Sequence, residues 1–224
     1  PISNKLRQLS RFSEGMKLSS KDRYWQWAGF ANKDETLLML HPELRINMWL
    51  KDFFPRRKAI LQSLPEKENI NDILYTDMNL VLPNDMLTKV DLMSMANALE
   101  VRVPFLDYEL VNFIFSLPVA YKIKSGMQKR IVRDAFRDFL PKKLYRRPKK
   151  GFEVPLLKWF RNEMKSLIVD DLLSEKFITE QEVFDYREID KLKRQLFSSN
   201  PRDIHARIWG LIVFQWWWRK YMIN

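Results

Sequence analysis

The sequence has no cysteine and only two histidines, His41 and His205. Disulfides, a thiol nucleophile and a cysteine-ligated metal are therefore excluded from this chain. A histidine-rich metal site is not expected either, because the two imidazoles are far apart in sequence. Glycine is scarce as well, and its five positions are too widely spaced for a phosphate-cradling loop: Gly15, Gly29, Gly126, Gly151 and Gly210. Any main phosphate-binding loop of the protein is expected to lie elsewhere.

Long apolar runs are also missing. The longest, from Ile208 to Trp218, is interrupted by Gln215 and is too short to span a bilayer. The N-terminus has neither an initiator methionine nor a signal-like apolar segment, so it reads as a cut inside a longer protein. We expect a cytoplasmic protein without a membrane partner.

The composition is typical of a folded protein with a positive charge that favours binding of anions. The 224 residues are 46% hydrophobic and 13% aromatic, which is enough for a buried core. The formal net charge of +11 favours contact with nucleic acid, a membrane surface or small phosphorylated molecules. Charge alone does not choose among these three.

Helical spacing dominates the chain and no run alternates convincingly like a strand, so the fold is expected to be mainly α. Helices are predicted over 71–80 and 84–99, separated at Pro83. Asp107 is expected to cap the helix that follows it, because its carboxylate can accept orphan backbone N–H groups. A helix is predicted after Gly126 and a loop over 146–152. The last helix carries three consecutive tryptophans, 216–218, which point in different directions around it.

Several charged residues form pairs by spacing. Lys89 and Asp91 lie two apart near the middle of a predicted helix, so they project to different sides. Glu100 and Arg102 flank a turn, where an ion pair can fix the path of the chain. Taken singly, these four residues and Asp107 are best interpreted as structural or solvated.

The same residues belong to longer motifs. Residues 82–91 read LPNDMLTKVD and residues 99–107 read LEVRVPFLD, followed by GMQK at 126–129 and RPKKGF at 147–152. Together, over residues 71–160, these motifs resemble the synthetase domain of glutamine-hydrolysing asparagine synthetases. Residues 161–224 are expected to form C-terminal helices that resemble the family only in their helical, aromatic-rich character.

The resemblance implies a fold and a reaction. The chain would be the helical C-terminal part of an α/β adenine-nucleotide α-hydrolase-like (ATP-pyrophosphatase) synthetase domain, with residues 1–224 forming a fragment of it. The family is a ligase that joins aspartate to ATP with Mg²⁺, forming β-aspartyl-AMP. Ammonia made from glutamine in an N-terminal glutaminase domain then attacks the activated carbonyl. The family's S-G-G-x-D-S loop and glutaminase cysteine are absent here, so the fragment alone is expected to be inactive.

The resemblance also assigns roles to residues. Lys149 matches the family's catalytic lysine. Lys129 matches a lysine near the phosphates, and Arg133, one helical turn further on, is a second candidate contact for pyrophosphate. Lys89 and Asp91 are candidate substrate contacts. Glu100, Arg102 and Asp107 are expected to fasten the wall of the site, and no metal ligand is expected in this chain.

Other functions stay open. A relative that amidates a sugar or a peptide, or that closes a ring, would share these motifs. A basic nucleic-acid-binding module is the alternative from another class, although no reader motif is present and nucleic acid is not an expected partner. A non-catalytic scaffold is a third alternative. The tryptophan-rich helix is expected to complete a contact with another domain or with the second subunit of a homodimer.

Overall fold

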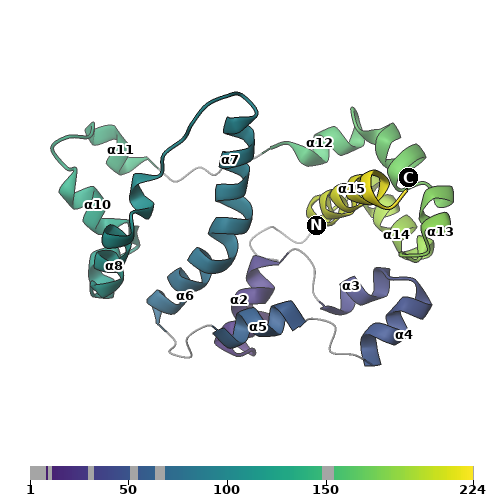
Figure 1. Ribbon diagram of the computed structural model, residues 1–224, viewed down its shortest axis with the longest axis horizontal. Coiled ribbons are helices and arrows are strands. Elements are labelled where there is room, and N and C mark those ends of the chain that lie inside the picture. Colours follow the sequence, from purple (N-terminus) through teal and green to yellow (C-terminus); the bar gives the residue numbers. More distant parts are fainter. Residues whose placement is uncertain are drawn as a thin grey trace. The chain divides into compact units, whose positions relative to one another are not determined.

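The computed structural model describes residue 9 and residues 12–29, 33–50, 55–63, 69–147 and 154–223. This part of the chain is mainly helical, as predicted from the sequence (Figure 1). The chain divides into two compact units, one formed by Pro1–Ala59 with Glu153–Asn224 and the other by Ile60–Phe152.

The first unit contains helices from both ends of the chain. Its N-terminal helices are α2 (Ser20–Ala28), α3 (Lys33–Met39), α4 (Pro42–Leu50) and the start of α5 (Pro55–Ser63). Its C-terminal helices are α12 (Leu156–Arg161), the π-helix η3 (Leu167–Leu172), α13 (Glu175–Gln181), α14 (Tyr186–Phe197) and α15 (Ile204–Tyr221).

The C-terminal helices enclose a hydrophobic core. In α14, Ile189, Leu192 and Leu196 recur at three- and four-residue spacing and are buried on one face. Ile208 of α15 packs in the same cluster. Side chains cap the N-termini of α13 and α14. Ser174 accepts a hydrogen bond from Phe177 N at the start of α13, and Asp185 accepts one from Arg187 N at the start of α14.

Backbone pairing joins the N-terminal helices to this core. Leu40 and Phe184 form an isolated antiparallel bridge. On either side of it, His41 N donates to Val183 O at 2.9 Å and Asp185 N donates to Met39 O at 2.9 Å. An ion pair of 2.9 Å between Arg207 and Glu35 adds a side-chain link. Segments more than a hundred residues apart in sequence therefore fold as one unit.

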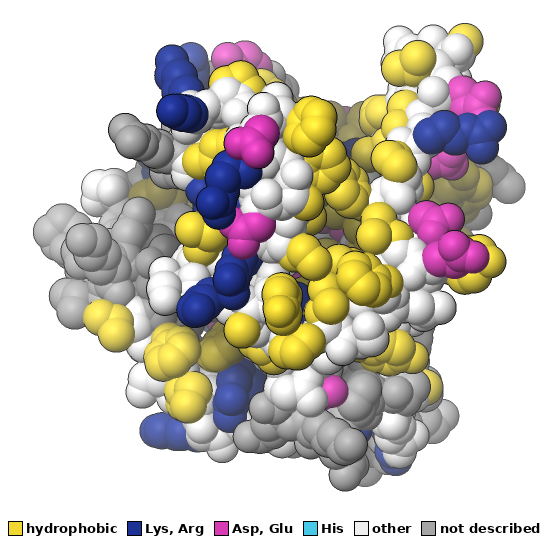
Figure 2. Space-filling model, turned by 90° about the vertical axis from the view of Figure 1, so that its left-hand side faces the viewer, with side chains coloured by type: hydrophobic (Ala, Val, Ile, Leu, Met, Phe, Trp, Pro, Cys, Tyr) yellow, Lys and Arg dark blue, Asp and Glu magenta, His cyan; other side chains and the backbone are white. Residues whose placement is uncertain are grey.

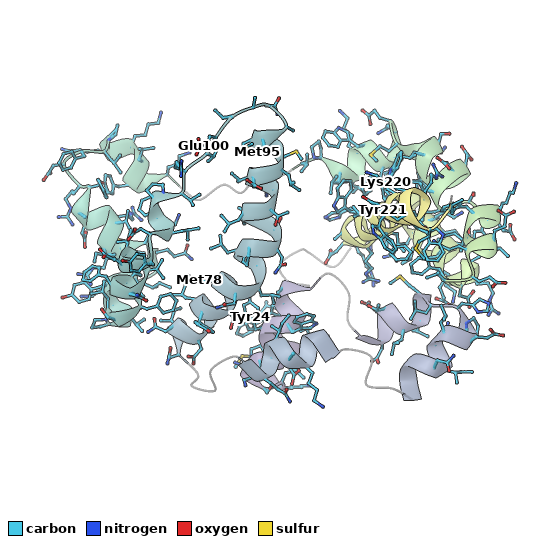
Figure 3. All side chains as sticks on the ribbon, viewed as in Figure 1. Tyr24, Met78, Met95, Glu100, Lys220 and Tyr221 are labelled. Carbon is cyan, nitrogen blue, oxygen red and sulfur yellow. The ribbon has the colours of Figure 1, made fainter. Side chains whose placement is uncertain are left out.

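Helix α15 has one buried and one exposed apolar face. Ile204, Ile208, Leu211 and Ile212 are buried, whereas Trp216 and Trp217 are about half exposed. Two of the three consecutive tryptophans are therefore exposed. Near the end of α15, Lys220 lies over the ring of Tyr221 at 5.2 Å, and both are labelled in Figure 3. Within the described part of the chain, no helix combines the length and apolarity required to cross a membrane.

The second unit contains the segments that carry most of the motifs. It begins with α6 (Ile70–Thr76), the π-helix η1 (Asp77–Leu87) and α7 (Thr88–Met95). These are followed by a 3-10 turn (Pro104–Leu106), α8 (Tyr108–Ser116), α9 (Val119–Lys122), β1 (Ile123–Lys124), β2 (Met127–Gln128), α10 (Arg130–Ala135) and α11 (Lys142–Arg146).

The predicted break at Pro83 is wrong. Helical structure runs without interruption from Ile70 to Met95, and Pro83 lies inside the π-helical stretch η1 (Figure 1). Proline lacks an N–H and its ring crowds the carbonyl four residues earlier, which disrupts the ordinary α-helical repeat. The wider π turn accommodates both effects, and Thr88 Oγ1 donates to Pro83 O at 2.6 Å.

A short hairpin before α10 was not predicted. Strands β1 and β2 pair antiparallel, with Ile123 opposite Gln128 and Lys124 opposite Met127. Ser125 and Gly126 form the turn, and both have positive φ, 50° and 77°. This is the geometry of a type I′ turn, which matches the twist of paired strands. The helix predicted after Gly126 begins only after this hairpin, at Arg130, and ends at Ala135.

A buried lysine joins two ends of the second unit. Lys122 is 6% exposed, and its ammonium donates to Asn71 Oδ1 and, at 3.4 Å, to Phe115 O. Asn71 also donates to Phe115 O at 3.3 Å. Burial lowers the pKa of Lys122 below its ordinary value. These contacts link α6 with α8 and α9, and no sequence pattern pointed to them.

Candidate functional site

Basic charge is concentrated in one stretch of the second unit. Residues 119–152 contain twelve Lys and Arg residues against Asp134 and Asp138, so this stretch carries +10 of the chain's net charge of +11. A concentration of this kind raises the local density of anions. The described part of it comprises α9, the hairpin, α10 and α11, and it contains both residues assigned to phosphate, Lys129 and Arg133.

Lys129 lies between β2 and α10 in a left-handed backbone conformation, with φ 55° and ψ 37°. An L-residue with a side chain rarely adopts this region, because Cβ approaches the neighbouring carbonyl. The side chain is exposed and forms no ion pair with any described residue. A strained residue that presents a free ammonium next to a hairpin suits contact with a phosphate group.

Arg133 is directed into the protein. It is half-buried, and its Nη2 donates to the carbonyl oxygen of Tyr145 in α11. Its guanidinium carbon lies 5.6 Å from the centre of the Tyr145 ring. The Tyr145 hydroxyl in turn donates to Phe136 O at 2.6 Å. Arg133 therefore connects α10 to α11.

Arg130 connects α10 to the preceding helix. Its Nη1 donates to Ala120 O at 2.8 Å, and its guanidinium lies 5.7 Å from the ring of Tyr121. Asp134 forms an ion pair with Arg130 at 3.3 Å and another with Arg137 at 2.7 Å. Sequence reasoning missed Arg130 and Tyr145, because neither residue type nor spacing indicates which carbonyl a guanidinium will reach.

Lys89 and Asp91 lie on α7. The Lys89 ammonium is 3.8 Å from Asp85 Oδ1 and 3.6 Å from Met86 Sδ, both within the preceding turn. Asp91 is exposed. In the described part of the chain, no hydrogen bond or ion pair joins either residue to Lys129 or Arg133. Their role as substrate contacts stays a prediction.

The three residues expected to be structural have different environments. Asp107 caps α8 as predicted, accepting from Glu109 N at 3.0 Å and Leu110 N at 3.1 Å. Glu100 and Arg102 form an ion pair, but their side chains are 70% and 85% exposed. A pair this open to water contributes little stability. Figure 3 labels Glu100 on the segment after α7, and its role in the wall of the site stays a prediction.

Lys149 lies outside the described residues, as do its neighbours from Pro148 to Glu153. The described chain ends on one side of this gap at Arg147, directly after α11, and begins again at Val154. Among the described residues, no group of three or more His, Asp or Glu side chains could hold a metal ion.

The second unit also exposes large hydrophobic side chains. Tyr108 is 71% exposed and Phe139 is 82% exposed. Figure 2 shows hydrophobic side chains spread between Lys and Arg on the face in view. Exposed apolar surface of this kind marks a contact with a protein, a membrane or a ligand.

Comparison with known proteins agrees with the motifs. The asparagine synthase family model matches residues 3–219, well beyond residues 71–160. Glutamine-hydrolysing asparagine synthetase 1 of Bacillus subtilis (strain 168) is 32% identical over 83% of this chain and 28% of its own length. A putative glutamine-hydrolysing asparagine synthetase of Mycobacterium tuberculosis (strain H37Rv) is 31% identical over 64% of this chain and 22% of its own length. The chain thus spans less than a third of these relatives. No solved structure matches.

Proposed function

The chain belongs to the asparagine synthase family, and we propose that it forms part of the synthetase site of an ATP-dependent, glutamine-hydrolysing asparagine synthetase. The family match over residues 3–219 is the observation that supports this proposal most strongly. In the proposed reaction, the β-carboxylate of aspartate attacks the α-phosphorus of ATP, giving β-aspartyl-AMP and pyrophosphate. Ammonia derived from glutamine then displaces AMP and forms the amide of asparagine.

Lys149 is proposed as the catalytic residue. In the sequence it follows the basic stretch of α11 and stands between Pro148 and Gly151. Its ammonium would neutralise the negative charge that develops on the phosphate and on the tetrahedral oxygen. A preorganised cation at such a point is among the largest contributions that an enzyme makes to lowering the barrier.

Lys129 is the described residue best suited to the phosphates of ATP. Its ammonium is exposed and has no carboxylate partner among the described residues, so no described carboxylate competes with a phosphate oxygen for it. Arg133 stays a proposed second contact, through the guanidinium N–H groups that do not bind Tyr145. Mg²⁺ would shield the phosphates, and we propose that other parts of the enzyme hold it.

The exposed hydrophobic side chains of the second unit suit a role inside a larger domain. We propose that these helices pack on the α/β core of an ATP-pyrophosphatase-type synthetase domain, next to a glutaminase domain. Burial of residues such as Phe139 by that core would remove an apolar surface that is unfavourable in water.

The test uses the full-length gene product with ATP and Mg²⁺, and follows pyrophosphate release as aspartate is added. Ammonium salts replace glutamine in a parallel series, so that a weak glutaminase does not hide the synthetase step. Lys149→Ala is expected to lower release by at least about a hundredfold. Lys150→Ala, at the next position in the sequence, is the matched control and is expected to retain activity.

Failure has a clear signature. If the folded protein released no pyrophosphate with aspartate and either nitrogen source, asparagine synthesis would be ruled out. Equal losses in the Lys149 and Lys150 variants would contradict a specific role for Lys149.

A further inference from the structure

Hydrogen bonds that run in both directions join α10 and its C-terminal turn to α11. Arg133 donates from α10 to the backbone carbonyl of Tyr145 and stacks on its ring. Tyr145 donates back from α11, through its hydroxyl, to the carbonyl of Phe136 at 2.6 Å. Because the bonds run in both directions, α11 cannot rotate or slide on α10 without breaking at least one of them.

The carbonyl of Phe136 is the centre of this contact. It also accepts from Phe139 N and Leu140 N, both at 3.1 Å. Three donors therefore meet on one oxygen at the end of α10, and they fix the turn that leads to α11. The Tyr145 hydroxyl is the only one of the three that comes from beyond the turn.

We propose that Arg133 and Tyr145 are positioning residues for the synthetase reaction. Tyr145 stands four positions before Lys149 in the sequence, so the orientation of α11 sets the direction in which the chain leaves towards that lysine. A lysine side chain has several rotatable bonds, and its backbone must be held for its ammonium to meet a developing charge. A misplacement of about 1 Å in such a site can lower the rate about a hundredfold.

Arg133 and Lys129 differ in what their side chains contact. The guanidinium of Arg133 is half-buried and already binds a carbonyl and a ring, whereas the ammonium of Lys129 is exposed and unpaired among the described residues. The whole ammonium of Lys129 is therefore available to phosphate, whereas Arg133 connects α10 to α11 and has only its remaining N–H groups for a phosphate. This inference rests on the proposed function.

Tyr145→Phe tests the proposal, because it removes one hydroxyl and leaves every charge in place. We expect kcat for aspartate-dependent pyrophosphate release to fall about tenfold or more, with little change in the KM for ATP. Arg133→Lys is expected to lower kcat likewise, and the double variant to be no worse than the poorer single variant. Tyr121→Phe is the matched control, since the hydroxyl of Tyr121 has no partner among the described residues, and it is expected to match the wild type.

Hydrogen exchange gives a readout that does not depend on activity. In the full-length protein without substrates, Tyr145→Phe is expected to speed amide exchange in peptides covering 136–147 and to leave peptides of α14 unchanged. Unchanged exchange over 136–147 would overturn the proposal. So would wild-type kcat in Tyr145→Phe, because the hydroxyl of Tyr145 would then play no part in the reaction. A wild-type protein without aspartate-dependent release would instead refute the proposed function, and exchange would still decide whether the two residues hold α11.

Discussion

Replacing Lys129 separates the backbone conformation of this residue from its charge. Lys129→Gly and Lys129→Ala both remove the ammonium, but only glycine adopts the left-handed region without strain. The left-handed conformation costs an L-residue about 1–2 kcal/mol, and glycine loses about 0.5–1 kcal/mol more backbone entropy on folding. We therefore expect the glycine variant to be more stable than the alanine variant by about 0.5–1 kcal/mol, the central difference between the two effects.

Urea denaturation of the full-length protein measures this difference, as a shift in midpoint at constant slope. The same two substitutions at Lys143, which is exposed in α11, serve as the control. Its φ is not positive, so Lys143→Gly is expected to be less stable than Lys143→Ala by about 0.5–1 kcal/mol. The opposite order at the two lysines separates backbone strain from the general cost of glycine.

Activity reports on the ammonium. Because both Lys129 variants lack it, pyrophosphate release at low ATP is expected to fall by a similar factor in each, about 10–100-fold for the loss of a charge-assisted contact. If the alanine variant were as stable as the glycine variant, the left-handed assignment would be refuted. If both variants kept wild-type release, Lys129 would have no role with phosphate.

Three further predictions concern stability. Ile208→Ala, in the core, is expected to lower the free energy of unfolding by about 2–5 kcal/mol in urea denaturation. Val213, half exposed on the same helix, is the control, and Val213→Ala is expected to change this free energy by less than about 1 kcal/mol. Similar losses in the two variants would contradict the observed burial. The hydrogen bond from Arg187 lowers the pKa of Asp185 below its ordinary value. Asp185→Asn is therefore expected to be less stable than the wild type above pH about 4, and the difference in free energy of unfolding is expected to shrink as the pH falls through the lowered pKa. A difference that does not depend on pH would refute this role of the charge. Lys122 has a lowered pKa, so the unfolded chain binds more protons between that pKa and about 10.4, and wild-type stability rises with pH across this window. Lys122→Met is expected to flatten the rise, and an unchanged slope would show that Lys122 does not cause it.

Local features of the fold could be read from the sequence because they depend on neighbours in the chain. Asp107 caps α8 through amides two and three residues away, so residue type and position were sufficient. The buried stripe of α15 follows from helical spacing. Pro83 does not follow from such local patterns. Proline disrupts an ordinary α-helix, but here the wider π turn accommodates it and the helix continues.

The candidate site divides in the same way. Its motifs identified the family and singled out Lys129 and Lys149, because residue identity and order are properties of the sequence. Which groups Arg133 and Lys122 contact was decided only by the tertiary structure. Tyr145 is twelve residues from Arg133, and Asn71 is fifty-one residues from Lys122. A long side chain can reach any acceptor that folding brings near, and the choice depends on how the helices pack. The sequence by itself therefore determined the mainly helical character, the cap at Asp107 and the chemistry available. The packing of the helices decided which charged groups are open to a ligand and which hold the described parts of the protein together.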